Sequence, residues 1–414
     1  MRFLILGLNY LPESTSIGPY TADLAESLAA RGHHVSVVTG FPMAPQWRIW
    51  KGYRNRLFMR QIVNGVPVLR TFLYVPSRPQ KSLNRILFDS SFALSSLIGG
   101  FVAGPADLVI AISPPLQLGL TAWLLGRVKH SPFVFHLQDL VPDAAVATGM
   151  LREDSRAVRL ARKIERFVYD RACSVGVISE GFVRNLTMKG VPPAKIALLP
   201  NYIDLDFLKP MDRNNGFRQQ YGIKSDTFLV MYSGSVALKQ GLQTFVDTAA
   251  EFRKADSVAF YMIGEGPYLG EIQSRANELQ IANLSFLPLQ SRENLPMQLS
   301  AADALVITQK RAVTDVVFPG KLLYYMAAGR PILAAVSPDS ETGRFITKHQ
   351  VGIVVPPEEP QALAEAVRYL RRNPNEIERL GQNGRRVAEE NFDRRVVLEK
   401  FVNYLETLVK KAKY

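Results

Sequence analysis

Cysteine and histidine are scarce in this sequence. Its 414 residues include one cysteine, Cys173, and five histidines. A single cysteine excludes a framework of disulfide bonds within the chain, and no C-x-x-C pair suggests a zinc site. A chain of this length without disulfide bonds suits a reducing compartment. We therefore expect a cytoplasmic protein with neither a zinc site nor a histidine-rich metal centre.

Acidic residues are missing from one long segment. Residues 27–88 contain ten Lys and Arg and no Asp or Glu, in a chain whose formal net charge is +13. Aromatic residues lie between the basic ones, and an apolar stretch, 86–102, follows with Asp89 as its only charge. This combination suits an anionic membrane surface. The predicted membrane or acceptor face consists of Trp47, Arg48, Trp50, Lys51, Arg54 and Arg56.

The basic segment is also compatible with nucleic acid or with solvent alone. Nucleic acid would satisfy the positive charge, although the chain contains no recognised nucleic-acid-binding motif. A solvated loop would need no partner at all. A membrane surface accounts for the aromatic residues as well as the charge. We therefore expect a peripheral protein on the inner face of the cell membrane, without a nucleic-acid partner.

Long uninterrupted hydrophobic runs are also lacking. The apolar run 3–8 is too short for a signal peptide, and no small-residue cleavage site follows it. The uncharged stretch 108–126 is long enough to span a bilayer, but Ser113-Pro114-Pro115 divides it. We expect a strand over 108–112, a turn, a helix from about Leu116, and no transmembrane segment.

Short apolar runs alternate instead with helical patterns, which is typical of parallel α/β folds. The predicted strands are 2–6, 34–39, 67–72, 108–112, 133–137, 174–178, 196–199, 227–233, 259–264, 284–287, 304–308, 331–334 and 352–355. This pattern predicts two tandem Rossmann-like domains, 1–200 and 201–390, followed by a C-terminal helix, 391–414. Residues 201–210 form the expected linker.

Glycine and lysine recur where predicted strands give way to helices. Ser233-Gly234-Ser235 ends a strand, and Lys239 stands just before the next helix. Gly264-Glu265-Gly266 and Pro319-Gly320-Lys321 are similar turns. Glycine lets the backbone approach a ligand, and helix N–H groups beside a lysine favour a diphosphate. The alternative is a set of ordinary tight turns with a surface lysine.

The segment 133–143 places polar side chains at the carboxyl end of a predicted strand, where an open α/β sheet builds its site. His136 and Asp139 are the candidates for catalysis. We favour Asp139, because His136 is equally compatible with a histidine of the hydrophobic core. Asp204-Leu205-Asp206 has the form of a metal–diphosphate motif, but its place in the linker favours a capping role.

Taken together, these motifs resemble family 4 of the retaining glycosyltransferases, which have the GT-B fold. The resemblance rests on the first β–α loop, on YSGS followed by KQG, on IGEGP and on PGKLLYYMAAGRPI, and it covers nearly the whole chain. Bacterial transferases of exopolysaccharide and colanic-acid assembly, including fucosyl- and N-acetylfucosaminyltransferases, are the most similar in pattern. The resemblance implies a nucleotide-sugar donor on the second domain, an acceptor on the first, and a C-terminal helix that packs back on the first.

By this resemblance Lys239 binds the donor phosphates and acts in catalysis. The residues implied for donor binding are Gly18, Gly234, Ser235, Lys239, Gly264, Glu265, Gly266, Phe286, Leu287, Pro319, Gly320, Lys321, Leu322 and Tyr324. The chain departs from the family pattern in two features. Ser235 stands where many members have arginine, and Tyr324 stands at the second glutamate of an E-x7-E pattern. Val316, beside Asp315, occupies the position of the first, so the ribose must be held differently.

The implied enzyme is a retaining hexosyl- or hexosaminyltransferase that needs neither a metal ion nor another cofactor. It would move a sugar, of the fucose or N-acetylfucosamine type, from a GDP- or UDP-linked donor to a polyprenyl-diphosphate-linked glycan in bacterial exopolysaccharide or O-antigen synthesis. One alternative is a nucleotide-sugar 2-epimerase on the same fold, which needs no basic aromatic face. Another is a non-catalytic scaffold of a polysaccharide assembly complex, which the missing glutamates would permit.

Overall fold

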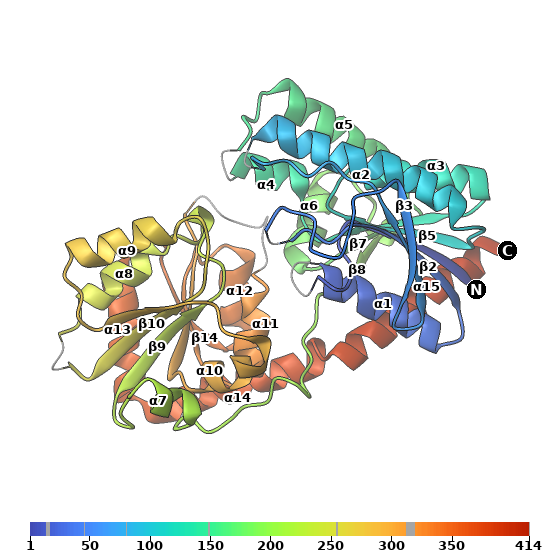
Figure 1. Cartoon of the computed structure of the whole chain (residues 1–414). Coiled ribbons are helices and arrows are strands. Elements are labelled where there is room, and N and C mark those ends of the chain that lie inside the picture. Colours follow the sequence, from blue (N-terminus) through green and yellow to red (C-terminus); the bar gives the residue numbers. More distant parts are fainter. Residues whose placement is uncertain are drawn as a thin grey trace. The chain divides into compact units, whose positions relative to one another are not determined.

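The computed structural model describes residues 1–13, 17–44, 46–79, 81–147, 150–253, 256–311 and 319–413. It divides into two compact units. The N-terminal unit consists of Met1–Asn201 with Arg395–Tyr414, and the C-terminal unit consists of Tyr202–Arg394. Each unit has helices on both faces of its own, mostly parallel sheet (Figure 1). The predicted α/β class with two Rossmann-like sheets is confirmed.

The sheet of the N-terminal unit has the strand order β3-β4-β2-β1-β5-β6-β7-β8. Its strands are β1 (Arg2–Gly7), β2 (His34–Gly40), β3 (Phe58–Val63), β4 (Val66–Thr71), β5 (Leu108–Ser113), β6 (Phe133–Leu137), β7 (Ser174–Val177) and β8 (Ile196–Leu198). Neighbours pair in parallel except β3 and β4, which form an antiparallel hairpin. The predicted strands omit β3. Its hairpin turns at Asn64-Gly65, where both φ angles are positive (49° and 80°), as a type I′ turn requires.

Helices cover both faces of this sheet. α2 (Ser82–Val102), α3 (Leu118–Lys129) and α5 (Arg156–Arg171) lie along one face, with α1 (Gly18–Ala30) and α15 (Arg394–Lys413) on the other (Figure 1). The shorter elements are α4 (Val141–Ala147), α6 (Glu180–Met188) and η1 (Pro193–Lys195). The end of the chain is fixed beside α1, because His33 Nε2 lies 2.8 Å from Glu406 Oε1 and Arg31 donates to Asn403.

α2 is long and apolar enough, by length and composition, to cross a membrane. Core helices can pass the same test, and one face of α2 does pack inside the unit. Phe88, Phe92 and Gly99 on that face are fully or almost fully buried. A Cβ on Gly99 would lie 2.7 Å from the Thr71 methyl carbon, so the glycine lets the helix approach β4 closely.

The C-terminal unit has a six-stranded parallel sheet in the order β11-β10-β9-β12-β13-β14. Its strands are β9 (Phe228–Ser233), β10 (Val258–Ile263), β11 (Leu284–Leu287), β12 (Ala304–Thr308), β13 (Ile332–Ala335) and β14 (Gly352–Val355). One core lies under α8 (Gln243–Ala250), α9 (Leu269–Glu278) and α13 (Pro360–Arg372). The other lies under α7 (Gly216–Gln220), α10 (Leu295–Ser300), α11 (Lys321–Ala327), α12 (Glu341–His349) and α14 (Pro374–Asn391). Short 3-10 turns, η2 (Leu238–Gln240) and η4 (Arg292–Asn294), complete the unit.

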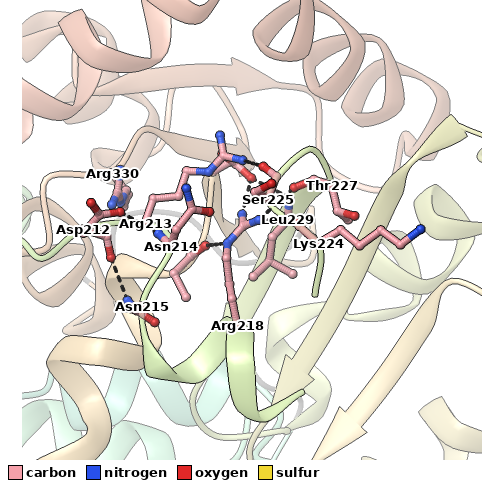
Figure 2. A network of polar contacts seen from close by, with 12 residues as sticks. Asp212, Arg213, Asn214, Asn215, Arg218, Lys224, Ser225, Thr227, Leu229 and Arg330 are labelled. Carbon is pink, nitrogen blue, oxygen red and sulfur yellow. Dashed lines mark hydrogen bonds and ion pairs between the residues drawn. The ribbon is translucent and has the colours of Figure 1, made fainter. Parts of the chain in front are cut away.

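A buried polar network lies at the amino-terminal ends of the strands of this sheet (Figure 2). The Asp303 carboxylate accepts hydrogen bonds from Arg218 Nη2 at 2.6 Å and from the Leu229 N–H at 2.7 Å, and it pairs with Arg213 Nη1 at 2.9 Å. The side chains of Asp303 and Arg218 are each 2% exposed. The network lies at the opposite end of the strands from a ligand site of an open α/β sheet, so its role is to fix the fold.

Candidate functional site

The C-terminal sheet has its topological switch point between β9 and β12, and open α/β sheets bind ligands outside the carboxyl ends of such strands. The loop after β9 carries Gly234, Ser235 and Lys239. It is tied to the end of β12 at two places. Thr308 Oγ1 donates to the Gln240 carbonyl at 2.5 Å, and the Lys310 N–H donates to the Lys239 carbonyl at 3.1 Å.

Three loops meet there through backbone contacts that only glycine permits. A Cβ on Gly264 would lie 1.9 Å from the Gly234 carbonyl oxygen, and one on Gly266 would lie 2.1 Å from that of Val236. Gly234 itself has φ +140°, a conformation that favours glycine. The Gly264 N–H donates to the Leu287 carbonyl at 3.1 Å. The fold thus brings the predicted segments after β9, β10 and β11 together.

Side chains around these glycines differ in exposure. Ser235 and Glu265 are exposed, and Phe286 is half-buried like Leu287. Exposed side chains beside a packed backbone are what a ligand can contact, so Ser235 and Glu265 remain candidates for polar contacts with a donor.

Lys321, the first residue of α11, points to the same place. Its Nζ donates to Tyr232 Oη at 2.6 Å and lies 3.8 Å from the centre of the Tyr232 ring, and a Cβ on Gly234 would lie 3.3 Å from it. Burial and the positive charge of Lys239 lower the pKa of Lys321 to about 7. Among the described residues neither lysine has an acidic partner. Two cations without a counter-charge favour an anionic ligand.

Tyrosines that the sequence analysis missed hold α11 in position. Tyr325 Oη accepts from the Ser233 N–H at 3.0 Å and donates to the Ser233 carbonyl at 3.1 Å, and Tyr232 Oη donates to the Ser235 carbonyl at 2.6 Å. Burial raises the pKa of both phenols far above its usual range. Neutral hydroxyls therefore fix Lys321 and the β9 loop without neutralising the lysine.

The remaining predicted residues of this unit lie on or beside α11. Pro319 is half-buried and Gly320 is exposed, immediately before the helix. Tyr324 is half-buried, and the nearby charge of Arg292 partly offsets the rise in its pKa that burial causes. Leu322 is fully buried in the core, so its side chain offers no contact to a ligand. Val316 and Asp315 lie outside the described residues.

In the N-terminal unit, Gly18 begins α1 and is buried. A Cβ there would lie 2.8 Å from the Glu13 carbonyl oxygen, so glycine is needed for the loop to fold against the helix. The Glu13 side chain is 2% exposed and organises two loops. It accepts from the Met43 and Ala44 N–H groups, both at 2.7 Å, and from Asn9 Nδ2 at 2.9 Å. The sequence analysis did not identify this carboxylate.

His136 and Asp139 lie in different environments. His136 is 3% exposed, its ring stacks obliquely on Phe401 of α15, and Gln138 Nε2 lies 3.0 Å from its Nε2. Burial lowers the pKa of His136 to about 4, so the ring is neutral. These contacts fit the alternative of a core histidine. Asp139 follows the end of β6 and its side chain is exposed, so it is the better placed of the two to meet a substrate.

The predicted membrane or acceptor face follows β2. Arg48, Lys51, Arg54 and Arg56 are exposed. Trp47 is half-buried and packs against Phe88 of α2, with ring centres 5.1 Å apart, and half-buried Trp50 donates from Nε1 to the Ala44 carbonyl at 3.1 Å. One basic residue of the 27–88 segment, Arg70, is not part of this exposed face. Arg70 is fully buried and donates to the carbonyls of Gly40 and Leu11.

The structure also defines the Asp-x-Asp segment of the linker. Asp204 Oδ1 accepts from the N–H groups of Asp206 and Phe207, at 3.1 and 3.0 Å. The carboxylate therefore caps a turn, as its position in the linker predicts. No group of three or more His, Cys, Asp or Glu in the described part of the chain is arranged to hold a metal ion.

Comparisons with known proteins agree with this geometry. Residues 15–202 match the model of a glycosyl transferase 4-like domain, and residues 214–387 match glycosyl transferases group 1. The chain is 30% identical over 410 residues to the colanic acid biosynthesis glycosyl transferase WcaI of Escherichia coli K12, covering 97% of this chain and 99% of that protein. It is 26% identical over 346 residues to the glycosyltransferase WbjE of Pseudomonas aeruginosa, covering 81% and 84%.

Solved structures share the fold at lower identity. Sucrose-phosphate synthase from Thermosynechococcus elongatus superposes with a TM-score of 0.76 at 19% identity, over 99% of both chains. Anabaena HepE, solved with UDP, superposes with a TM-score of 0.73 at 17% identity, over 98% of this chain and 100% of that one. With two Rossmann-like units, matches to glycosyltransferase models in both, and full-length similarity to a bacterial transferase, this chain is a glycosyltransferase of family 4 with the GT-B fold.

Proposed function

We propose that this enzyme transfers a sugar from a GDP- or UDP-linked donor to a polyprenyl-diphosphate-linked glycan, with retention of configuration and without a metal ion. The observation that carries this proposal is the pair Lys239 and Lys321, which lack an acidic partner among the described residues and stand at the switch point of the C-terminal sheet. A diphosphate supplies the counter-charge that they lack, and a nucleotide sugar places its diphosphate at the bond that breaks.

The two lysines act on the leaving group. Negative charge builds up on the diphosphate as the glycosidic bond breaks, and Lys239 and Lys321 stabilise it. Because Lys321 is half-buried, its interaction with that charge is stronger than in water. The acceptor hydroxyl attacks from the face that the leaving group vacates. Its proton passes to a phosphate oxygen or to Asp139, and the products are a nucleoside diphosphate and the lengthened glycan.

The substrate class is proposed from the relatives. WcaI is named for colanic acid biosynthesis, and this chain is similar to it along nearly its whole length. We infer a role in bacterial exopolysaccharide or O-antigen synthesis, with a hexose or hexosamine of the fucose or N-acetylfucosamine type. Turnover measured with different donor sugars and different acceptor glycans tests the proposed sugar type and the proposed pathway.

Because the proposed acceptor is anchored in the membrane by its lipid, we propose that the enzyme acts while bound to the membrane surface. The N-terminal unit has a surface suited to such binding. Five side chains form one stripe on the outer face of α2, and each is 47–67% exposed: Leu83, Leu87, Leu94, Ile98 and Phe101. The opposite face of α2 is packed in the core, so we propose that the helix lies in the plane of the cytoplasmic leaflet and does not cross it. The basic segment supplies attraction to anionic lipid.

A thermal-shift screen tests donor binding first. The protein is heated with UDP-, GDP-, dTDP- and ADP-sugars, with and without EDTA. A donor at about 100 times its dissociation constant adds roughly 2.7 kcal/mol of stability. A shift with one nucleotide class that survives EDTA supports the proposal and names the base. Failure of every nucleotide sugar to shift the melting temperature would instead favour the scaffold.

Product analysis then separates transfer from epimerisation. With the selected donor and a polyprenyl-diphosphate-linked glycan, transfer gives free nucleoside diphosphate and a longer glycan whose anomeric configuration matches the donor. An epimerase would change the donor sugar without an acceptor. Inverted configuration in the product would contradict the retaining mechanism while leaving the transfer itself intact.

A further inference from the structure

Two buried side chains of opposite charge lie near the carboxyl ends of the strands in the N-terminal unit. Glu13 stands in the loop after β1 and is 2% exposed, and Arg70 stands on β4 and is 0% exposed. Burying a charge costs free energy unless the charge is paired and hydrogen-bonded. The hydrogen bonds of both side chains go to backbone and side-chain groups of neighbouring loops.

The Glu13 carboxylate joins the loop after β1 to the loop after β2. Its Oε1 accepts from the N–H groups of Met43 and Ala44, both at 2.7 Å, and its Oε2 accepts from Asn9 Nδ2 at 2.9 Å. Trp50 Nε1 in turn donates to the Ala44 carbonyl at 3.1 Å. The segment that follows β2 is therefore attached to the residues that Glu13 holds.

The Arg70 guanidinium connects the same two loops a second time. Its Nη1 donates to the carbonyl of Gly40, the last residue of β2, at 2.8 Å, and its Nη2 donates to the Leu11 carbonyl in the loop after β1. Burial lowers the pKa of Arg70, and the negative charge of Glu13 opposes this change. Glu13 therefore supplies counter-charge for the buried guanidinium. We call this pair of side chains the Glu13–Arg70 brace.

The Glu13–Arg70 brace lies where the N-terminal sheet is expected to bind a ligand. The strand order of that sheet changes direction between β1 and β5, which makes the carboxyl end of β1 its topological switch point. The backbone of Glu13 also packs against the start of α1, because a Cβ on Gly18 would lie 2.8 Å from the Glu13 carbonyl oxygen. One residue thus fixes the loop after β1, the start of α1 and the loop after β2.

We propose that Glu13 and Arg70 are positioning residues for the transfer, which together hold the loops after β1 and β2 in the shape that admits the acceptor. Both side chains are almost completely enclosed, so they act through the loops and not on the substrate itself. The charge of Glu13 is essential, because without it the guanidinium of Arg70 would be buried and uncompensated. This inference rests on the proposed transfer to an acceptor that the N-terminal unit binds.

Three variants separate the charge of Glu13 from its hydrogen bonds. E13Q keeps an oxygen for the Met43 and Ala44 N–H groups, and the Asn9 amide can turn over to accept from the new Nε2, so the main loss is the charge. N9D/E13Q returns a carboxylate to the same cluster and a hydrogen bond between the two side chains. E180Q, at an exposed position at the start of α6, is the matched control.

Hydrogen exchange without any substrate, measured by mass spectrometry, tests the brace itself. In E13Q, peptides that contain Met43 and Ala44 should exchange about tenfold faster, whereas peptides of the C-terminal sheet should exchange as before. N9D/E13Q should recover most of the protection, and E180Q should match the unaltered protein. Unchanged exchange of these peptides in E13Q, or faster exchange throughout the protein, would overturn the proposal.

Steady-state kinetics then test the effect on the reaction. E13Q should raise the KM for the acceptor about tenfold, with kcat and the donor dissociation constant nearly unchanged, and N9D/E13Q should lower that KM again. An unchanged acceptor KM in a variant whose loop exchanges faster would also overturn the positioning role. Absence of transfer by the unaltered protein would instead refute the proposed function, and hydrogen exchange would still decide whether Glu13 and Arg70 hold the two loops.

Discussion

The lowered pKa of Lys321 makes donor affinity depend on pH in a definite direction. Burial and the charge of Lys239 bring this pKa to about 7, from an ordinary value of 10.5. A bound diphosphate favours the charged lysine and raises its pKa again. Above pH 7, donor binding must therefore take up a proton, so the dissociation constant is lowest below pH 7 and increases as the pH rises.

The size of the effect follows from the same value. A lysine with a pKa of about 7 is almost fully charged at pH 6 and about 3% charged at pH 8.5. Because the donor binds the charged form, its dissociation constant should increase about thirtyfold between these pH values, which is about 2 kcal/mol of binding free energy. The diphosphate of a nucleotide sugar is fully ionised throughout this range. The ionisation of the donor therefore adds nothing to the pH dependence of the dissociation constant.

Isothermal titration calorimetry measures this effect directly. Dissociation constants are recorded from pH 6 to 8.5, and at pH 8 in two buffers with different ionisation enthalpies, which reveal the protons taken up. We expect close to one proton per donor. Lys321→Arg should bind more weakly at pH 6 but with no pH slope, because its guanidinium stays charged. A flat dissociation constant and no proton uptake for the unaltered protein would refute the reasoning.

Three further predictions concern other parts of the molecule. Lys239→Ala should lower the turnover rate by roughly 10²–10³ with the melting temperature unchanged, and near-normal turnover would remove its role. Asp303→Ala should cost about 3–5 kcal/mol in urea unfolding, because it leaves Arg218 charged, buried and unpaired; Asp226→Ala, at an exposed position, is the control. Leu87→Asp with Leu94→Asp should abolish sedimentation with anionic vesicles. Met188→Asp, at a residue 79% exposed on α6, should not.

The fold was largely predictable because its strands are buried on both faces and read as continuous apolar runs. Every strand of the C-terminal sheet was predicted within a residue or so of its ends. β3 was missed because it is an edge strand whose residues are half-buried or exposed and so form no continuous apolar run. The signal was nevertheless present in Asn64-Gly65, a dipeptide that favours a tight hairpin between alternating side chains.

The candidate site was predictable only where local sequence determines the backbone. Glycines at strand ends and the lysines beside them are local signals, and Lys239 and Lys321 do lie at one switch point. Glu13 and Tyr325 were not found, because their roles depend on partners such as Met43 and Ser233 that are far away in the sequence. Long-range hydrogen bonds leave no periodic pattern in a sequence.

The two cationic features should respond differently to salt, which separates donor binding from membrane attachment. Arg48 and its neighbours are exposed, and the Debye length falls from about 8 Å at 0.15 M to about 3 Å at 1 M salt. Attraction to a charged surface should therefore weaken steeply over this range. Lys321 is half-buried, so its proposed contact with the donor diphosphate should be screened much less. Raising salt should release the enzyme from vesicles while changing the donor dissociation constant only a few-fold. Parallel losses of both would mean that donor binding, too, depends mainly on the exposed cations.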